Sequence, residues 1–285
     1  MTTSSDIVEG SGGGGAPARP PRRAKLKPRT RARLTRCAIY AITVLVLLWF
    51  ASIVDWAKLQ SAFFDPEIAK EMFPKVITVA AKNTLIFTFL GFTGGIAFGL
   101  LLALMRLSSI RPYRWFASIY IEIFRGIPAI VTIVLVGFAL PIAVGVRVPF
   151  TYGPGAVALA IVTSAYLAET IRAGIEAVPR GQTEAARSLG MSPFRTQISV
   201  VIPQAFRIIL PPLTNEFILL LKDTSLLFVL GVTEETVELS KFGRDAVGKT
   251  FNGTPIVVVA VVYLAITIPL TRAVAMLERR AKRAR

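Results

Sequence analysis

Residues 83–105 read NTLIFTFLGFTGGIAFGLLLALM, a run without a single charged side chain. A helix of this length, at 1.5 Å per residue, crosses the ~30 Å hydrocarbon core of a bilayer. Gly91, Gly95 and Gly99 recur every four residues, so they share one helix face where a neighbouring helix can approach closely. The run therefore predicts a packed membrane-spanning helix and an all-α integral membrane fold.

The composition of the whole chain agrees with a membrane protein. Of its 285 residues, 53% are hydrophobic and 18% are charged, whereas about one quarter of a soluble domain is charged. The sequence has no histidine, which excludes a histidine general base, a histidine-containing zinc site and a Ser-His-Asp triad. Cys37 is the single cysteine, so no internal disulfide can form. We expect neither a metal site nor redox chemistry.

Gaps between charged residues predict six membrane spans. They cover residues 37–54, 83–105, 126–146, 148–168, 208–232 and 250–271. The first is an additional N-terminal transmembrane helix, because its uncharged run fits an uncleaved anchor better than a signal peptide. The other segments are predicted from their composition as a disordered basic cytoplasmic tail (1–36), an extracytoplasmic loop (55–79) and a second basic cytoplasmic tail (278–285).

An even number of spans places both termini on one side of the membrane. That side would hold 24 of the lysine and arginine residues, and the other side seven. Positive charge is retained on the cytoplasmic side, so we expect both termini in the cytoplasm. Most of the formal net charge of +16 lies in the two tails, where the anionic cytoplasmic leaflet attracts it. This distribution favours a membrane protein over a nucleic-acid-binding one.

The predicted cytoplasmic segment 172–207 has the pattern of two helices joined by a tight turn. A short helix over residues 182–189 ends at Gly190, and Ser192 followed by Pro193 is typical of the start of a second helix. Residues 182–207 alone could be a DNA-binding helix-turn-helix, but tethering to membrane spans at both ends disfavours that function. The pattern equally fits a solvated loop helix or a helix that docks into a partner's groove.

Several motifs in register resemble one protein family. The run EAARSLG (184–190), nine further residues and VVIP (200–203) resemble the Glu-Ala-Ala loop of bacterial ATP-binding-cassette (ABC) importer permeases. Five further motifs resemble the polar amino-acid uptake branch: FRGIP at 124–128, AYLAETIRAG at 165–174, VPRGQ at 178–182, PQAFR at 203–207 and KDTSL at 222–226. The resemblance extends over residues 80–277 and implies a type I ABC importer transmembrane domain (MetI-like). Thr132 departs from the pattern, because many relatives have Gln there.

The resemblance also implies a function and a set of partners. The loop 172–207 would contain the coupling helix that docks into a cytoplasmic ABC ATPase dimer. The residues in matching positions are Gly181, Glu184, Ala185, Ala186, Gly190 and Pro203. The chain would be a multi-pass permease of the bacterial cytoplasmic membrane that carries a polar or charged amino acid. A second permease subunit, identical or paralogous, and an extracytoplasmic amino-acid-binding protein would complete the importer. ATP and Mg²⁺ would be used by the ATPase, and this chain would bind no cofactor, catalyse no reaction and contact no nucleic acid.

One further motif resembles a nucleotide-binding loop but lacks the flanking strand and helix that such a loop needs. GRDAVGKT (243–250) satisfies the Walker A pattern. A phosphate-binding loop of this kind needs a preceding strand and a following helix whose N-terminus faces the phosphates. Here the motif directly precedes the last predicted span and lies on the extracytoplasmic side, away from ATP. We therefore expect it to bind no nucleotide.

Charged residues interrupt the predicted span 208–232. Each ionisable side chain within a membrane span costs about 2.5–3.5 kcal/mol, and such residues usually face a bundle interior or a wet cavity. At 100° per residue, Glu216 and Asp223 share one helix face, and Asn215 and Lys222 share the adjacent one. One hypothesis is that this side lines a substrate pathway, formed by Asn215, Glu216, Lys222, Asp223, Thr224 and Ser225. The alternative is that these groups pair with other helices and fix the bundle.

Two further functions stay open from the residues alone. An autonomous ion-coupled secondary transporter would use the ionisable face of the span 208–232 as a proton or sodium relay. A membrane-anchored DNA-binding protein would use the segment 182–207 and the basic tails.

Overall fold

The computed structural model describes residues 28–144, 152–231 and 233–283, and all regular structure in them is helical. The chain divides into two compact units, residues 1–55 and 56–285. In the first unit, the described residues 28–55 contain one helix, α1 (Pro28–Ile53), whose apolar part, Thr35–Ile53, is long enough to cross a membrane. Of the predicted disordered tail, residues 1–27 lie outside the described residues. Residues 28–36 belong to α1, because arginine is a good helix former.

The second unit begins with two short helices where the sequence predicts a loop. These are α2 (Trp56–Phe63) and α3 (Pro66–Glu71), and Asp65 caps α3 by accepting a hydrogen bond from the Glu67 amide at 2.9 Å. The Asp65 amide donates to Thr254 Oγ1 at 2.9 Å, and the Gly253 amide donates to the Ala62 carbonyl at 2.7 Å. Residues 56–71 are therefore fastened to the start of the last helix.

A π-helical turn, η1 (Val76–Ala81), continues into α4 (Lys82–Leu107), the helix that contains the opening run. The face of α4 that contains Gly91, Gly95 and Gly99 packs on α7 (Gly153–Glu176). A Cβ atom on Gly91 would lie 2.8 Å from Leu159 Cβ, and one on Gly99 would lie 2.9 Å from Leu167 Cβ. The close approach predicted from the glycine spacing is thus confirmed.

The region of the predicted span 126–146 contains a bend. α5 (Arg111–Gly126) and α6 (Ala129–Val144) are long and apolar enough to cross a membrane only when taken together, and their axes are bent by 111°. Pro128 explains the break, because the residue before a proline is driven to an extended conformation and Ile127 has φ −92° and ψ 137°. α5 lies where the sequence predicts a loop. The charged residues on one face of this amphipathic helix interrupt the uncharged run by which a span is predicted.

The later spans also differ in their limits from those predicted. α7 runs over 153–176 rather than 148–168, and residues 145–151 lie outside the described residues. α10 (Ile202–Asp223) starts before residue 208 and ends in a 3₁₀ helix, η3 (Thr224–Leu230). Residues 239–250 form a separate helix, α11 (Leu239–Thr250), and α12 (Thr254–Arg283) includes most of the predicted tail 278–285. The uncharged runs underestimate the length of these helices, because each helix continues through charged residues that lie beyond the hydrocarbon core.

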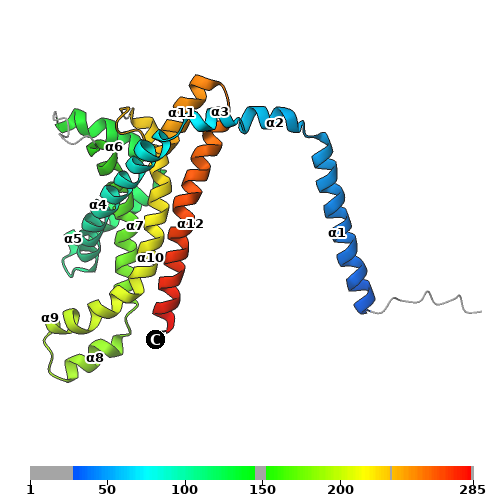
Figure 1. Cartoon of the computed structure of the whole chain (residues 1–285). Helices are drawn as coiled ribbons and strands as arrows, with labels where there is room; N and C mark the ends of the chain where they lie inside the picture. The colour runs from blue at the N-terminus through cyan, green and yellow to red at the C-terminus, as the bar shows by residue number, and fades with distance from the viewer. Residues whose placement is uncertain (1–27, 145–151, 232, 284–285) are drawn as a thin grey trace, which may run out of the picture. The chain divides into compact units, whose positions relative to one another are not determined.

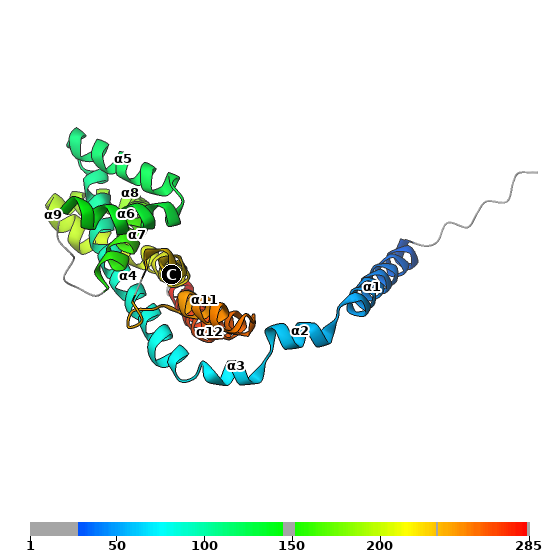
Figure 2. The same ribbon diagram turned by 90° about the horizontal axis from the view of Figure 1, so that it is seen from above.

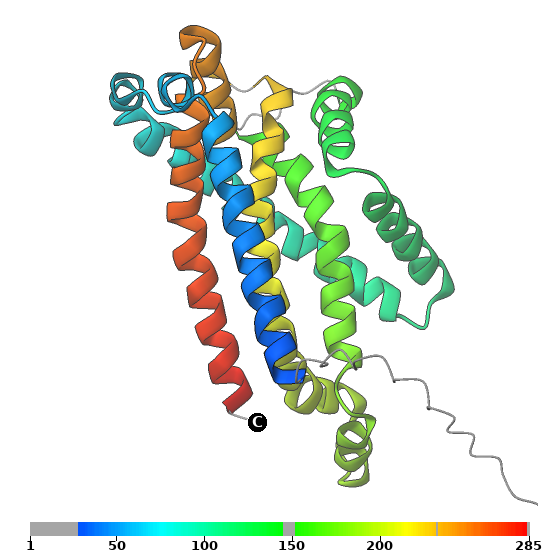
Figure 3. The ribbon, with the colours of Figure 1, turned by 90° about the vertical axis from the view of Figure 1, so that its right-hand side faces the viewer.

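Within the described residues, four single helices and the bent pair are long and apolar enough to span a membrane. α10 is not among them, because its four charged residues lower its hydropathy. It nevertheless lies between α7 and α12 and contacts both (Figure 3), and Figure 2 shows α10 and α12 nearly end-on. The predicted span 208–232, the fifth along the chain, therefore belongs to the bundle by its packing, although its composition alone does not identify it.

The helices of the second unit define two ends (Figure 1). α3 and α11 lie at one end, which we call the α3–α11 end. α8 (Arg180–Ser188), α9 (Pro193–Thr196) and the C-terminal end of α12 lie at the other, which we call the α8–α9 end. Between them, one buried cluster joins α4, α6, α7, α10 and η3 through Phe87, Ile133, Leu159, Leu220 and Leu227.

Replacing Gly99 by alanine tests the α4–α7 contact. The added Cβ would lie 3.0 Å from the Ser164 carbonyl oxygen, which is backbone and cannot rotate away. We expect a loss of about 1–3 kcal/mol, measured as a lower thermal midpoint of the purified protein. Gly126→Ala is the matched control, because a Cβ there meets nothing within 4 Å. Equal midpoints for the two variants would contradict the role of the glycine face.

Candidate coupling loop and membrane pathway

The segment between α7 and α10 has the helix–turn–helix form that its sequence predicts. α8 ends in a paired turn in which the Met191 amide donates to the Ala186 carbonyl at 3.2 Å and the Gly190 amide donates to the Arg187 carbonyl at 3.0 Å. Gly190 has φ +80°, a conformation that costs little only for glycine. Gly190 is therefore required by the backbone of the turn.

The second helix starts as expected. The Ser192 hydroxyl accepts a hydrogen bond from the Arg195 amide at 3.3 Å, and Pro193 is the first residue of α9. A π-helical turn, η2 (Gln197–Val201), connects α9 to α10. Pro203 is the second residue of α10 and follows directly on this π-helical turn.

The exposed surface of this loop is apolar at its tip. Leu189 is 84% exposed and Phe194 is 76% exposed, while Glu184 and Ala185 are also exposed. Ala186 is buried, so its small size serves the packing of α8 on α9 and η2 rather than a partner. Gly181 is exposed, and a Cβ there would meet nothing within 4 Å. The surface that a partner can contact is thus centred on Leu189.

Both ends of the loop are anchored in tight packing. A Cβ on Gly174 of α7 would lie 2.1 Å from Ile209 Cγ1 of α10, so these two helices nearly touch where the loop begins and ends. Buried side chains of α4, α7, the α7–α8 connection, η2 and α10 surround this contact: Ala103, Ile171, Val178, Val201, Ala205 and Ile209. The two ends of the loop are therefore packed against several membrane helices together.

A chain of ion pairs reinforces the same region. Arg106 Nη1 of α4 lies 2.5 Å from Glu169 Oε2 of α7. Arg172 also bonds Glu169, and its Nη1 lies 2.5 Å from Glu176 Oε2 in the last turn of α7. Glu169 and Arg172 lie in one sequence motif, but no spacing signal connected Arg106 with Glu169 across 63 positions.

The polar side of α10 contains the predicted pathway residues in different environments. Asn215 and Lys222 are exposed, and Glu216 and Asp223 are half-buried. The side chains of these four residues form no hydrogen bond or ion pair with the described residues. Among the described residues, no hydrogen bond or ion pair supports the alternative in which these side chains fix the bundle by pairing with other helices.

The two hydroxyl residues that follow differ from this group. Thr224 is buried, and its hydroxyl donates to the Leu221 carbonyl at 2.7 Å. Ser225 is half-buried at the start of η3. Thr224 therefore has a bonding role within the helix end, whereas Ser225 retains a partly accessible hydroxyl.

At the α3–α11 end, α4 holds the segment that leads into α11. Asn83 Nδ2 donates to the carbonyls of Glu235 and Val237 at 2.8 and 3.0 Å, and Asn83 Oδ1 accepts from the Tyr152 hydroxyl at 2.8 Å. The Leu239 amide donates to Thr84 Oγ1 at 3.1 Å. Asn83 is the first residue of the uncharged run 83–105, and no pattern in the sequence indicated this polar role.

Glu238 is a buried carboxylate that caps α11. Its Oε2 and Oε1 accept hydrogen bonds from the amides of Ser240 and Lys241, each at 2.6 Å. Burial raises the pKa of Glu238 from 4.5 to about 7, because the charged form loses its hydration. The Walker A-like residues 243–250 all lie within α11, so they form no phosphate-binding loop.

A polar cavity of about 930 Å³ opens beside this segment. Its walls come from α3, η1, the start of α4, residues 233–237 and α11. Charges of both signs line it: Glu71, Lys75, Lys82, Glu234, Glu235, Lys241, Asp245 and Lys249. The α3–α11 end therefore presents a mixed-charge surface, in contrast to the apolar tip of the coupling loop.

The raised pKa of Glu238 predicts a pH-dependent stability. Between pH 4.5 and 7 the unfolded carboxyl group has released its proton while the folded one retains it, so stability falls as the pH rises. The free energy of unfolding falls by about 3 kcal/mol in total, and the decrease is complete above pH 7. Glu238→Gln should remove this slope from unfolding midpoints measured between pH 5 and 8. The exposed Glu234→Gln should keep it, and an unchanged slope in Glu238→Gln would refute the assignment.

Comparison with known proteins identifies the family. Residues 95–283 match the family model described as "Binding-protein-dependent transport system inner membrane component". The probable glutamine ABC transporter permease protein GlnM of Bacillus subtilis (strain 168) is 36% identical over 198 residues, which cover 70% of this chain and 89% of that protein. The arginine transport system permease protein ArgU of Corynebacterium glutamicum (strain ATCC 13032) is 32% identical over 281 residues, covering 92% of this chain and 84% of the relative.

A solved structure agrees with these relatives. The crystal structure of an amino acid ABC transporter with histidines contains a chain that is 39% identical, with a TM-score of 0.68. The match covers 76% of this chain and 98% of that one. These findings confirm the resemblance drawn from the motifs, and they favour an ABC permease over an ion-coupled secondary transporter. The chain belongs to the family of binding-protein-dependent transport system inner membrane components and is a membrane-embedded permease subunit of an ABC importer.

Proposed function

We propose that this permease conducts a polar or charged amino acid into the cytoplasm. The observation that carries the proposal is the set of charged side chains on α10, Glu216, Lys222 and Asp223, which form no hydrogen bond or ion pair with the described residues. Relatives named as glutamine and arginine permeases support the substrate class.

The polar side of α10 is suited to a zwitterion. Unpaired charges in a membrane span are costly unless they face a wet cavity or a ligand. The α-carboxylate of an amino acid would pair with Lys222, and its α-ammonium group with Glu216 or Asp223, in charge-assisted hydrogen bonds. Asn215 and Ser225 would add neutral hydrogen bonds, whereas Thr224 would contribute through the helix end that it fastens.

The α8–α9 end would be the contact with the ATPase. Leu189 would enter an apolar groove of a cytoplasmic ABC ATPase dimer, with Glu184 and Ala185 at the edge of the contact. ATP and Mg²⁺ would be bound there by the ATPase and not by this chain. The packing of Gly174 on Ile209 would convert closure of the ATPase into movement of α7 and α10.

The other partners follow from the same orientation. The C-terminal end of α12 and the coupling loop lie at one end of the bundle (Figure 1), which supports a cytoplasmic C-terminus in the bacterial cytoplasmic membrane. The basic N-terminal residues would place the other terminus on the same side. The mixed-charge α3–α11 end would then receive an extracytoplasmic amino-acid-binding protein. A second permease subunit, identical or paralogous, would face the exposed side of α10 and complete the pathway.

Uptake by the reconstituted complex tests the pathway. Lys222→Gln should lower the uptake of radiolabelled substrate by roughly 10- to 100-fold, the value of one hydrogen bond to a charged group. Arg114→Gln removes one exposed cation of α5 that does not line the polar cavity, so it is the control and should transport normally. Normal uptake by Lys222→Gln in a fully assembled complex would refute the pathway, and uptake that needs no ATP would favour the ion-coupled transporter.

The turn at Gly190 provides a test of coupling. Gly190→Val places a β-branched residue at φ +80°, so the loop should distort and the ATPase should dissociate or hydrolyse ATP without transport. Gly190→Asn should retain much of the coupling, because asparagine tolerates left-handed backbone. The measurement is ATP hydrolysed per substrate transported, together with the ATPase content of the purified complex. Equal ratios in both variants would contradict the proposed role.

A further inference from the structure

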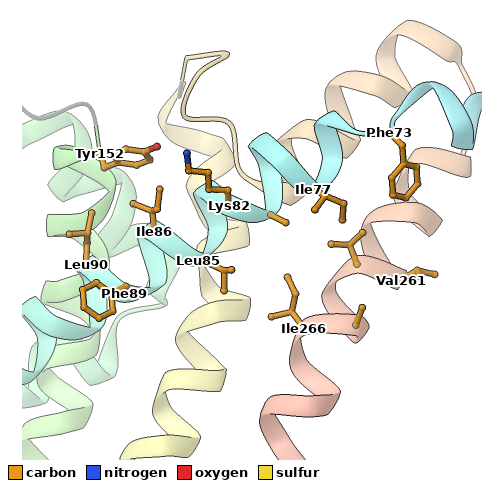
Figure 4. Close-up of a pocket in the computed structure, with 13 residues that line it drawn as sticks. Phe73, Ile77, Lys82, Leu85, Ile86, Phe89, Leu90, Tyr152, Val261 and Ile266 are labelled. Atoms are coloured by element: carbon orange, nitrogen blue, oxygen red, sulfur yellow. The ribbon is translucent and has the colours of Figure 1, made fainter.

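An apolar groove runs along the outside of the bundle between η1 and α4 on one side and α12 on the other (Figure 4). Its volume is about 860 Å³. Ile77, Leu85 and Phe89 form one wall, and Val261 and Ile266 form the other. Apart from Lys82 and Tyr152, every residue that lines the groove is apolar.

The groove opens toward the lipid when the chain is in a membrane. Both of its walls belong to helices that are long and apolar enough to span the bilayer, Val76–Leu107 and Thr254–Met276. The wall residues are accessible, since Leu85 is 44%, Phe89 65% and Val261 58% exposed. Hydrocarbon rather than water fills such a space at membrane depth, so its natural occupant has an acyl chain.

The polar end of the groove contains an unpaired positive charge. Lys82 lies six residues into the apolar stretch that begins at Val76, and its side chain forms no ion pair or hydrogen bond with the described residues. In Figure 4 its ammonium group points away from the apolar wall and toward the side of Tyr152. The Tyr152 hydroxyl donates to Asn83 Oδ1, so Lys82 is left as the cationic group at this end.

We propose that the groove binds an anionic phospholipid, with its phosphate on Lys82 and an acyl chain along the α4 and α12 walls. An ammonium group within a span is stabilised when it reaches an anion at the membrane surface, and the lysine stem can lie on apolar side chains. A free phosphate ion matches the charge but not the apolar length. The substrate proposed above lacks the long chain, so this site is separate from the transport pathway and does not depend on it.

Lipid-dependent stability of the delipidated complex in detergent tests the charge. Phosphatidylglycerol should raise the thermal midpoint more than phosphatidylcholine with the same acyl chains. Lys82→Gln should weaken the apparent affinity for phosphatidylglycerol by about fivefold, as expected for one lysine at a membrane surface. Lys75→Gln is the matched control and should behave as the unmodified protein, because Lys75 lines the polar cavity but not the groove. No preference for phosphatidylglycerol, or equal losses in both variants, would overturn the proposal.

A second variant tests the acyl chain. Ala265 lines the groove and is exposed, so Ala265→Phe narrows the groove without disturbing the core. It should reduce the phosphatidylglycerol retained in native mass spectrometry while Lys82 is intact, and Ala265→Ser should not. Full retention by Ala265→Phe, or equal stabilisation by inorganic phosphate, would overturn the acyl contact.

Crosslinking tests the rival occupant, a second copy of this chain. In a Cys37→Ser background, Leu85→Cys should form no disulfide-linked dimer in phosphatidylglycerol vesicles, because lipid covers the groove. Efficient dimer formation would show that a second copy fills it and would overturn the lipid site.

Discussion

The contact between α4 and α7 is the constraint on which the rest of the bundle depends. Lipid tails are as apolar as the helix surfaces, so helices in a membrane associate through close packing rather than through the hydrophobic effect. Gly91 and Gly99 bring the backbone of α4 against Leu159 and Leu167, at distances that a larger residue would prevent. α7 in turn contacts α5, α6 and α10, and its position therefore sets theirs.

The coupling proposed for the loop between α7 and α10 would depend on this rigidity. α7 continues into α8 after a few residues, and Gly174 packs on Ile209 where the chain returns through α10. The bonds of Arg172 to Glu169 and Glu176 tie the last turns of α7 together, and Arg106 connects them to α4. A displacement of α8 is consequently shared by α4, α7 and α10 and is not absorbed by a flexible connection.

Some polar side chains of this chain have hydrogen-bond partners within it and others do not. The first set stabilises the fold, and the second set is the one to which we assign binding roles. Asn83 and Glu238 are buried with hydrogen bonds to neighbouring backbone groups, so they fix the entry to α11. Lys222 and Lys82 have no such partners among the described residues. Because an unpaired charge at membrane depth is costly, its partner is expected outside the chain, a substrate for Lys222 and a lipid for Lys82.

The sequence by itself determined the membrane class, the glycine contact, the turn at Gly190 and the charged side of α10, because each depends on local spacing along one helix. Only the tertiary structure decided the bend at Pro128, the burial of Ala186 and the pairing of Arg106 with Glu169. α5, α2 and α11 were missed for a related reason, since charged faces make amphipathic helices resemble loops. Contacts between distant residues depend on how helices pack, and no periodicity in a single sequence encodes that arrangement.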